Sequence, residues 1–150
     1  MKMKANDVLT KYEFLSRILL KSESGELSKD LKVKLIAMRV EYGKIKREYD
    51  ADFKEFAQGL LTPEFEALRD KQDKSEEEMQ ECNKMNSDFN SSYNKYVIER
   101  INEDITVSDK TLTPEDLEEI ITVNADTEVD INGNHFSAGD FLENISILFS

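Results

Sequence analysis

The sequence predicts a mainly α protein, in which a long antiparallel helical hairpin precedes a small C-terminal α+β unit with a β-hairpin. Apolar residues recur at helical spacing through most of the first two thirds of the chain, interrupted by a polar segment at residues 69–88. After Asp104 this period gives way to short segments punctuated by Thr-Pro and Asn-Gly. We therefore predict a helical hairpin domain over residues 1–104, and a C-terminal unit over residues 105–150 that packs on it or is attached to it.

The first predicted helix covers residues 6–21, where apolar residues fall at positions 8, 9, 12, 15, 18 and 19. Asn6 or Asp7 is placed to cap its start. The segment SESGELS then predicts a loop, and Ser28 is placed to cap the next helix. These signals are local, because each depends on a few neighbouring residues.

The second predicted helix carries a heptad seam, which is typical of a coiled coil. Its apolar residues alternate in steps of four and three; they are Leu31, Leu35, Met38, Tyr42, Ile45, Tyr49, Phe53 and Phe56. At about 1.5 Å per residue, such a helix is roughly 45 Å long. A helix of that length needs a partner along its apolar seam.

A break follows at Gly59, and Thr62 with Pro63 predicts the start of another helix. Residues 69–88 are either a solvated helical arm or a flexible connector, and we favour a weakly packed helix. Residues 86–103 then predict a helix that folds back against the seam, with core positions at Phe89, Tyr93, Tyr96, Val97 and Ile101.

The C-terminal third contains shorter elements. ITVSDKTL is compatible with a short strand, and Thr113 before Pro114 predicts a capped helix over TLTPEDLEEII. Ser137, with Asp140 three residues later, predicts the cap of a last helix. Together with the apolar residues around Asn132-Gly133, these signals indicate a small α+β unit.

The segment DINGNHFSAGD at residues 130–140 gathers the side chains that most suggest chemistry. A calcium loop with Gly133 at its sixth position would place Glu128 first, but its twelfth position would be Gly139, where a bidentate glutamate is needed. A catalytic Asp and His pair would need a nucleophile, and the nearest hydroxyl, Ser137, is better explained as a helix cap.

A β-hairpin accounts for more of the same residues, because Asn-Gly is the strongest short-range signal for a two-residue turn. In that register Val129 faces Phe136, Asp130 faces His135 and Ile131 faces Asn134. We therefore predict that Asp130 and His135 are neighbours on the solvent-exposed face. The sequence predicts no catalytic residue, no metal ligand and no cofactor.

Charge is unevenly distributed and restricts the classes of partner. Residues 1–58 carry a net charge of +3, whereas residues 59–150 carry −15. Such a surface repels phosphate, so we predict no direct nucleic-acid binding by the acidic C-terminal half. No apolar run is long enough for a membrane span, the N-terminal segment lacks a signal-peptide core, and Cys82 is the only cysteine. We expect no membrane association, no evident small-molecule substrate, and a location in the cytoplasm of a host cell or in a virion.

The long amphipathic helix predicts contact with a protein partner or self-association, since its polar intramolecular partner leaves part of the seam uncovered. The predicted interaction face comprises Leu35, Met38, Tyr42, Ile45, Tyr49, Phe53, Phe89, Tyr93 and Tyr96. We expect a non-enzymatic interaction or assembly protein. Two alternatives are an acidic regulator or inhibitor that binds a basic site on another protein, and a hydrolase that uses two of the 32 carboxylates.

Two segments, LSKDLKVKLIAMRVEYGKIKREYDADFKEF and FNSSYNKYVIERINEDITVSDKTLTPEDLEEI, carry a resemblance to known proteins. Their layout resembles the small acidic helical proteins of tailed phages, which combine a long charged helix with a terminal unit of short elements. The resemblance implies a phage structural, assembly or packaged protein, and it implies no catalytic residues. The VDINGNHF hairpin is not part of it.

Overall fold

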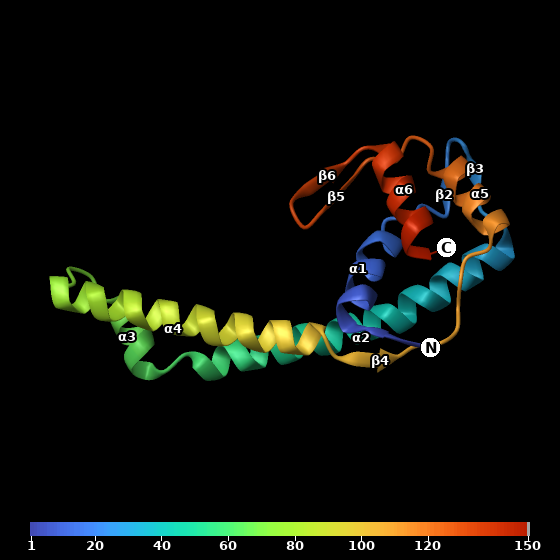
Figure 1. Cartoon of the computed structure of the whole chain (residues 1–150). Coiled ribbons are helices and arrows are strands. Elements are labelled where there is room, and N and C mark those ends of the chain that lie inside the picture. Colours follow the sequence, from blue (N-terminus) through green and yellow to red (C-terminus); the bar gives the residue numbers. More distant parts are fainter. Residues whose placement is uncertain (150) are drawn as a thin grey trace. The chain divides into compact units, whose positions relative to one another are not determined.

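The computed structural model describes residues 1–149, which form a mainly α protein with small β elements (Figure 1). These residues divide into two compact units. Unit 1 contains residues 1–46 and the chain from Asp104 onward, and unit 2 is Arg47–Glu103. Helix α2 (Lys29–Leu60) contributes residues to both units. Among residues 1–149, none of the helices combines the length and the hydropathy of a transmembrane span.

This division differs from the predicted one, which placed residues 1–104 together. Unit 2 ends at Glu103. The first 46 residues, however, share one hydrophobic core with the C-terminal part of the chain. The reason is that α1 and the beginning of α2 bury their apolar faces against C-terminal elements, which a reading of consecutive segments does not reveal.

Unit 1 combines helices with three two-stranded antiparallel sheets, in which β1 pairs with β4, β2 with β3 and β5 with β6. Helix α6 lies beside α1 (Figure 1). Besides the first part of α2, the elements are β1 (Lys2–Lys4), α1 (Ala5–Leu15), β2 (Lys21–Ser22), β3 (Gly25–Glu26), β4 (Asp104–Thr106), α5 (Pro114–Val123), β5 (Val129–Ile131), β6 (Asn134–Phe136) and α6 (Ala138–Phe149).

The two C-terminal helices of unit 1 begin at the capping residues that the sequence predicted. Thr113 and Asp116 form a reciprocal capping box at the start of α5, with Pro114 in the first turn. The Ser137 hydroxyl accepts a hydrogen bond from the Asp140 N–H at the start of α6, at 3.2 Å. Helix α1 is shorter than predicted and ends at Leu15, where the Arg39 guanidinium donates to the Leu15 carbonyl at 3.1 Å.

The core of unit 1 is centred on aromatic and aliphatic side chains from both ends of the chain. Phe14 of α1 stacks on Phe141 of α6, with ring centroids 6.1 Å apart, and meets Phe136 of β6 edge-on at 5.3 Å. Leu31 and Leu35 of α2 are buried in the same cluster. Burial of this apolar area is what joins the N-terminal and C-terminal residues into one unit.

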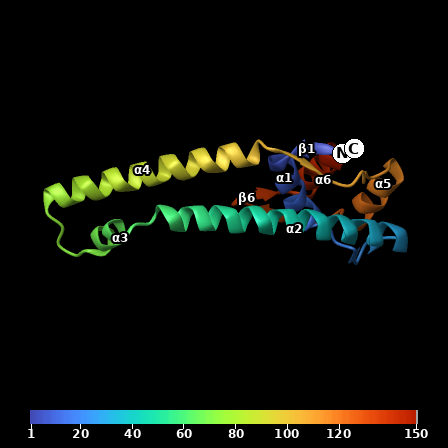
Figure 2. The ribbon, with the colours of Figure 1, turned by 90° about the horizontal axis from the view of Figure 1, so that it is seen from below.

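Unit 2 is an antiparallel arrangement of the end of α2 with α3 (Pro63–Asp70) and α4 (Glu76–Ile101) (Figure 2). Rings of Phe56 and Tyr96 stack with centroids 3.9 Å apart, and Phe65 of α3 meets Phe89 of α4 edge-on at 6.0 Å. Increasing residue numbers on α2 and α3 therefore meet decreasing numbers on α4, as the predicted hairpin requires.

The polar segment 69–88 is divided by a short connection at residues 71–75. Its second part is helical, because Ser75 and Glu78 form a capping box that starts α4. We predicted either a weakly packed helix or a connector there, and the structure contains one of each. Helix α2 also continues through Gly59, which we expected to end it, and stops at Leu60 before the Thr62 cap.

Candidate functional site

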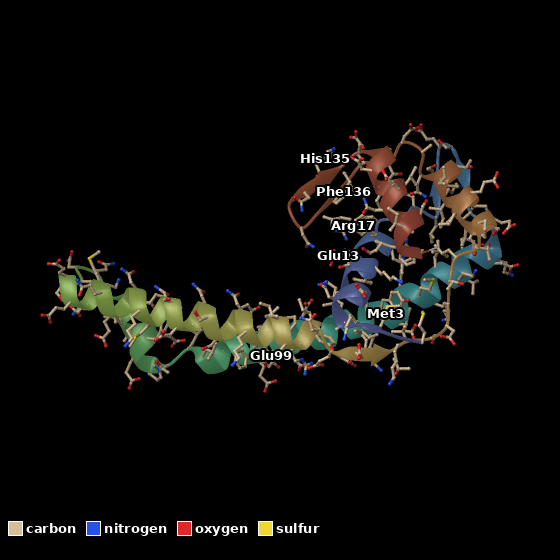
Figure 3. The ribbon with its side chains drawn as sticks, in the orientation of Figure 1. Met3, Glu13, Arg17, Glu99, His135 and Phe136 are labelled. Atoms are coloured by element: carbon tan, nitrogen blue, oxygen red, sulfur yellow. The ribbon has the colours of Figure 1, made fainter. Side chains whose placement is uncertain are left out.

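The β5–β6 hairpin has the register predicted from the sequence. Asn132 and Gly133 form its turn with φ angles of 52° and 80°, which is why an Asn-Gly pair is needed there. Asp130 faces His135 across the hairpin. Phe136 contacts Phe14 of α1, whereas His135 on the other side of β6 is exposed (Figure 3).

Asp130 and His135 form an ion pair on this hairpin, with Asp130 Oδ1 and His135 Nδ1 2.8 Å apart. The hydrogen bond to Asp130 raises the pKa of His135 above its ordinary value. The side chains are 60% and 77% exposed for His135 and Asp130. In the part of the chain that the structure describes, no hydroxyl or thiol is hydrogen-bonded to His135, and the pair has the geometry of an exposed cross-strand contact.

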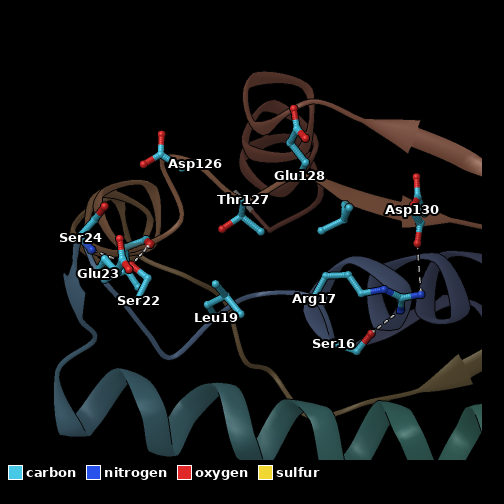
Figure 4. A pocket seen from close by; sticks show the side chains of 12 residues that line it. Ser16, Arg17, Leu19, Ser22, Glu23, Ser24, Asp126, Thr127, Glu128 and Asp130 are labelled. Carbon is cyan, nitrogen blue, oxygen red and sulfur yellow. Dashed lines mark hydrogen bonds between the residues drawn. The ribbon is translucent and has the colours of Figure 1, made fainter.

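An open depression of about 630 Å³ lies beside this hairpin, between the loop after α1 and the segment from α5 to β5 (Figure 4). Arg17 extends into it and donates hydrogen bonds to the Ser16 hydroxyl at 2.9 Å and the Asp130 carbonyl at 3.5 Å. The acids Glu23, Asp126 and Glu128 also line it.

The chemistry of this depression is that of an acidic surface. Across residues 1–149, no three side chains of His, Cys, Asp or Glu are grouped to hold a metal ion. Arg17 Nη1 lies 3.2 Å from Glu13 Oε2 and forms an ion pair with it. The guanidinium already has a partner within the protein, so it is not reserved for a ligand. The depression presents carboxylates to solvent, and such a surface suits a cationic group better than an anionic one.

Asn124 lies next to Val123, one of the residues that line the depression, and is 0% exposed. Its side-chain oxygen accepts from the Leu19 N–H at 2.8 Å, and its amide nitrogen donates to the Leu19 carbonyl at 3.2 Å and the Ile120 carbonyl at 3.0 Å. All the strong hydrogen-bonding groups of this amide face protein atoms. Asn124 therefore joins the loop after α1 to the end of α5, a role that sequence inspection did not predict.

The predicted interaction face is largely internal, and this corrects the prediction. Leu35, Met38 and Tyr42 are 0%, 1% and 1% exposed and lie in the core of unit 1. Ile45 packs against the same core. The heptad seam is buried here in a core to which α1 and the C-terminal elements both contribute, so Leu35, Met38 and Tyr42 are not available to a partner.

The remaining residues of that face lie in unit 2 and contact one another. Tyr49 is buried and meets Phe53 edge-on at 5.9 Å, and Phe53 meets Tyr96 at 6.2 Å. Phe89 stacks on Tyr93, with centroids 6.2 Å apart. These rings hold α2 and α4 together, and Phe89 also contacts Phe65 of α3. All of the rings of the predicted face except Tyr49 stay partly exposed.

Helix α2 also has an apolar row that the sequence prediction missed. Val33, Ile36 and Val40 are 59%, 47% and 65% exposed and lie on the side of α2 opposite the buried seam. Their spacing of three and four residues places them on one helical face. We refer to these three residues as the α2 stripe. The sequence contained a signal for this second row. The segment LKVKLIAMRV has more apolar residues than one buried helical face needs, so some of them must lie on another side of the helix.

Comparison of the chain with protein-family models, with curated proteins and with solved structures gives no match.

Proposed function

We propose that this chain is a non-enzymatic protein–protein interaction or assembly protein that acts through the exposed side of its long helix α2. The observation that carries the proposal is the α2 stripe. Singly exposed apolar residues are ordinary on a protein surface, but three on one face of a helix in a chain with 35% charged residues are not. An apolar row at this spacing is the usual docking surface for another helix.

The resemblance to acidic helical proteins of tailed phages supports a phage structural, assembly or packaged protein, found in the host cytoplasm or in the virion. Mass spectrometry of purified particles from a phage that encodes this chain separates these two locations. Detection of the chain at fixed stoichiometry supports a virion protein, whereas its absence from particles and presence in infected cells supports an assembly role.

Site-specific photo-crosslinking in the producing cells tests the proposal. A photoreactive amino acid replaces Val40 on the stripe, and the same group at the exposed Glu118 of α5 is the matched control. We expect one adduct of defined mass from position 40 that disappears when Val33 is changed to serine, and no such adduct from position 118. Absence of an adduct at position 40, with a monomer at every concentration in light scattering, contradicts an interaction role.

A second candidate is an acidic regulator or inhibitor that binds a basic site on another protein. Residues 101–150 carry a net charge of −11, and Glu23, Asp126 and Glu128 gather around one depression of unit 1. Binding of this kind weakens steeply with salt, whereas docking through the α2 stripe depends on apolar burial and persists. Measuring the partner's affinity at low and high salt therefore discriminates between the two.

A further inference from the structure

The α2 stripe is bracketed by positive charge. Lys29 lies four residues before Val33 and Lys44 lies four residues after Val40, so both share the helical face of the stripe. Both lysines are exposed, and neither forms an ion pair within residues 1–149. Other lysines of this segment are engaged, since Lys34 binds Asp116. The stripe thus ends in a free cation on each side.

The stripe also lies on a locally basic segment of an acidic chain. Residues 29–46 hold six Lys/Arg and two Asp/Glu, a net charge of +4, in a chain whose net charge is −12. Of these six bases, Lys32, Lys34 and Lys46 form ion pairs with acids of unit 1. The charge that the stripe's own face offers to a partner is therefore that of Lys29 and Lys44, which attracts a surface of opposite sign. The chemistry therefore favours a partner with carboxylates at the edges of an apolar face.

A second copy of the chain does not supply that partner. In an antiparallel pair of stripes Val33 faces Val40 of the other copy, and Lys29 then faces Lys44; in a parallel pair each lysine faces itself. The other exposed large hydrophobic residues of the described chain occur singly on their elements or far apart; they are Met1, Leu19, Met79, Ile98, Ile121 and Ile147. No other described helix offers a complementary row.

We infer that the α2 stripe binds an amphipathic helix of a different protein, one with apolar residues at helical spacing and acidic residues one turn beyond them at each end. This inference rests on the proposed function and names the class of partner. Packing of such a helix against Val33, Ile36 and Val40 buries all three side chains, and its terminal carboxylates reach Lys29 and Lys44.

Two synthetic helical peptides test the inference with the full chain. Both carry leucines at helical spacing, and they differ only in having glutamates or lysines one turn outside the leucines. Fluorescence anisotropy measures their binding to the wild-type chain, to Val33→Ser/Val40→Ser, to Lys29→Glu/Lys44→Glu, and to the control Lys84→Glu/Lys95→Glu. The control changes two exposed lysines of α4 that have no ion pair within residues 1–149.

We expect the glutamate peptide to bind the wild-type chain about tenfold more tightly than the lysine peptide. The serine variant removes binding, the Lys29→Glu/Lys44→Glu variant reverses the preference, and the control keeps it. Equal binding of the two peptides, binding that survives the serine changes, or no binding of either peptide overturns the inference. So does a dimer, seen by sedimentation, that the serine variant dissociates. A crosslink from Val40 together with any of these results leaves the proposed function standing and refutes only the acidic-helix partner.

Discussion

Replacing Asn124 with alanine removes the side chain that joins the loop after α1 to the end of α5. Three hydrogen bonds with Leu19 and Ile120 are lost together with one from the Thr127 hydroxyl, and the Leu19 N–H loses its acceptor in a part-buried hydrogen bond. A buried donor left without a partner costs about 1–3 kcal/mol, and each lost bond adds about 0.5–1.5 kcal/mol. Because these contributions overlap, we expect the free energy of unfolding to fall by about 3 kcal/mol.

Urea unfolding followed by circular dichroism measures this loss, and amide hydrogen exchange at Leu19 reports the local effect. With a urea dependence of about 2 kcal/mol per molar, the midpoint falls by about 1.5 M. Asn144→Ala is the matched control, since within residues 1–149 its amide donates only to the Asp140 carbonyl one turn earlier, at 2.8 Å on the surface. That control changes stability by about 0.5 kcal/mol or less. A loss below about 1 kcal/mol for Asn124→Ala, with the Leu19 amide still protected, refutes the reasoning.

The other predictions concern local contacts. Gly133→Val lowers the free energy of unfolding by about 2 kcal/mol, because a β-branched residue is strained at a φ of 80°. His135→Ala leaves the urea midpoint unchanged at a pH above the pKa of His135, where the imidazole is neutral. Thr113→Ala loses about 1 kcal/mol by the same assay through loss of the α5 cap. We expect NMR titration to give a pKa of His135 above that of a histidine in an unfolded peptide, and Asp130→Asn to abolish this shift. The small stabilisation that the protonated histidine contributes is therefore present below the unfolded pKa and is lost as the pH rises through the folded pKa. Hydrogen bonds from Lys71 and, to a lesser extent, Ser75 lower the pKa of Glu78 to about 2. The stabilisation that the Glu78 carboxylate gives to the start of α4 is therefore lost only as the pH falls toward that value. Amide exchange at the start of α4 measures this loss as reduced protection.

The best-predicted parts of this protein are those determined by neighbouring residues. Asn132-Gly133 specified the turn and the register of its hairpin, since positive φ angles at two successive positions leave few alternatives. The Thr113 and Ser137 hydroxyls cap α5 and α6 as expected. The exposed placement of Asp130 and His135 followed from the alternation of side chains along a strand.

Apart from the packing within the helical hairpin, contacts between distant segments were not predicted. The strand β1 at Lys2–Lys4 pairs with β4 at Asp104–Thr106, and nothing in either segment alone specifies the other. The hydrogen bonds between Asn124 and Leu19 span 105 residues of chain. Such pairings depend on which apolar surfaces meet in the core. That depends on how the whole chain packs, so no short segment of the sequence specifies them.

The helical character of α2 and the period of its heptad seam were determined by the sequence alone, because side chains three and four residues apart share one face of a helix. Only the tertiary structure decided what covers that seam. The core of unit 1, built from α1 and the C-terminal elements, buries Leu35, Met38 and Tyr42, which removes them from the predicted interaction face. Since a helix with apolar residues on two sides can bury either one, it was the packing of unit 1 that left Val33, Ile36 and Val40 exposed to solvent.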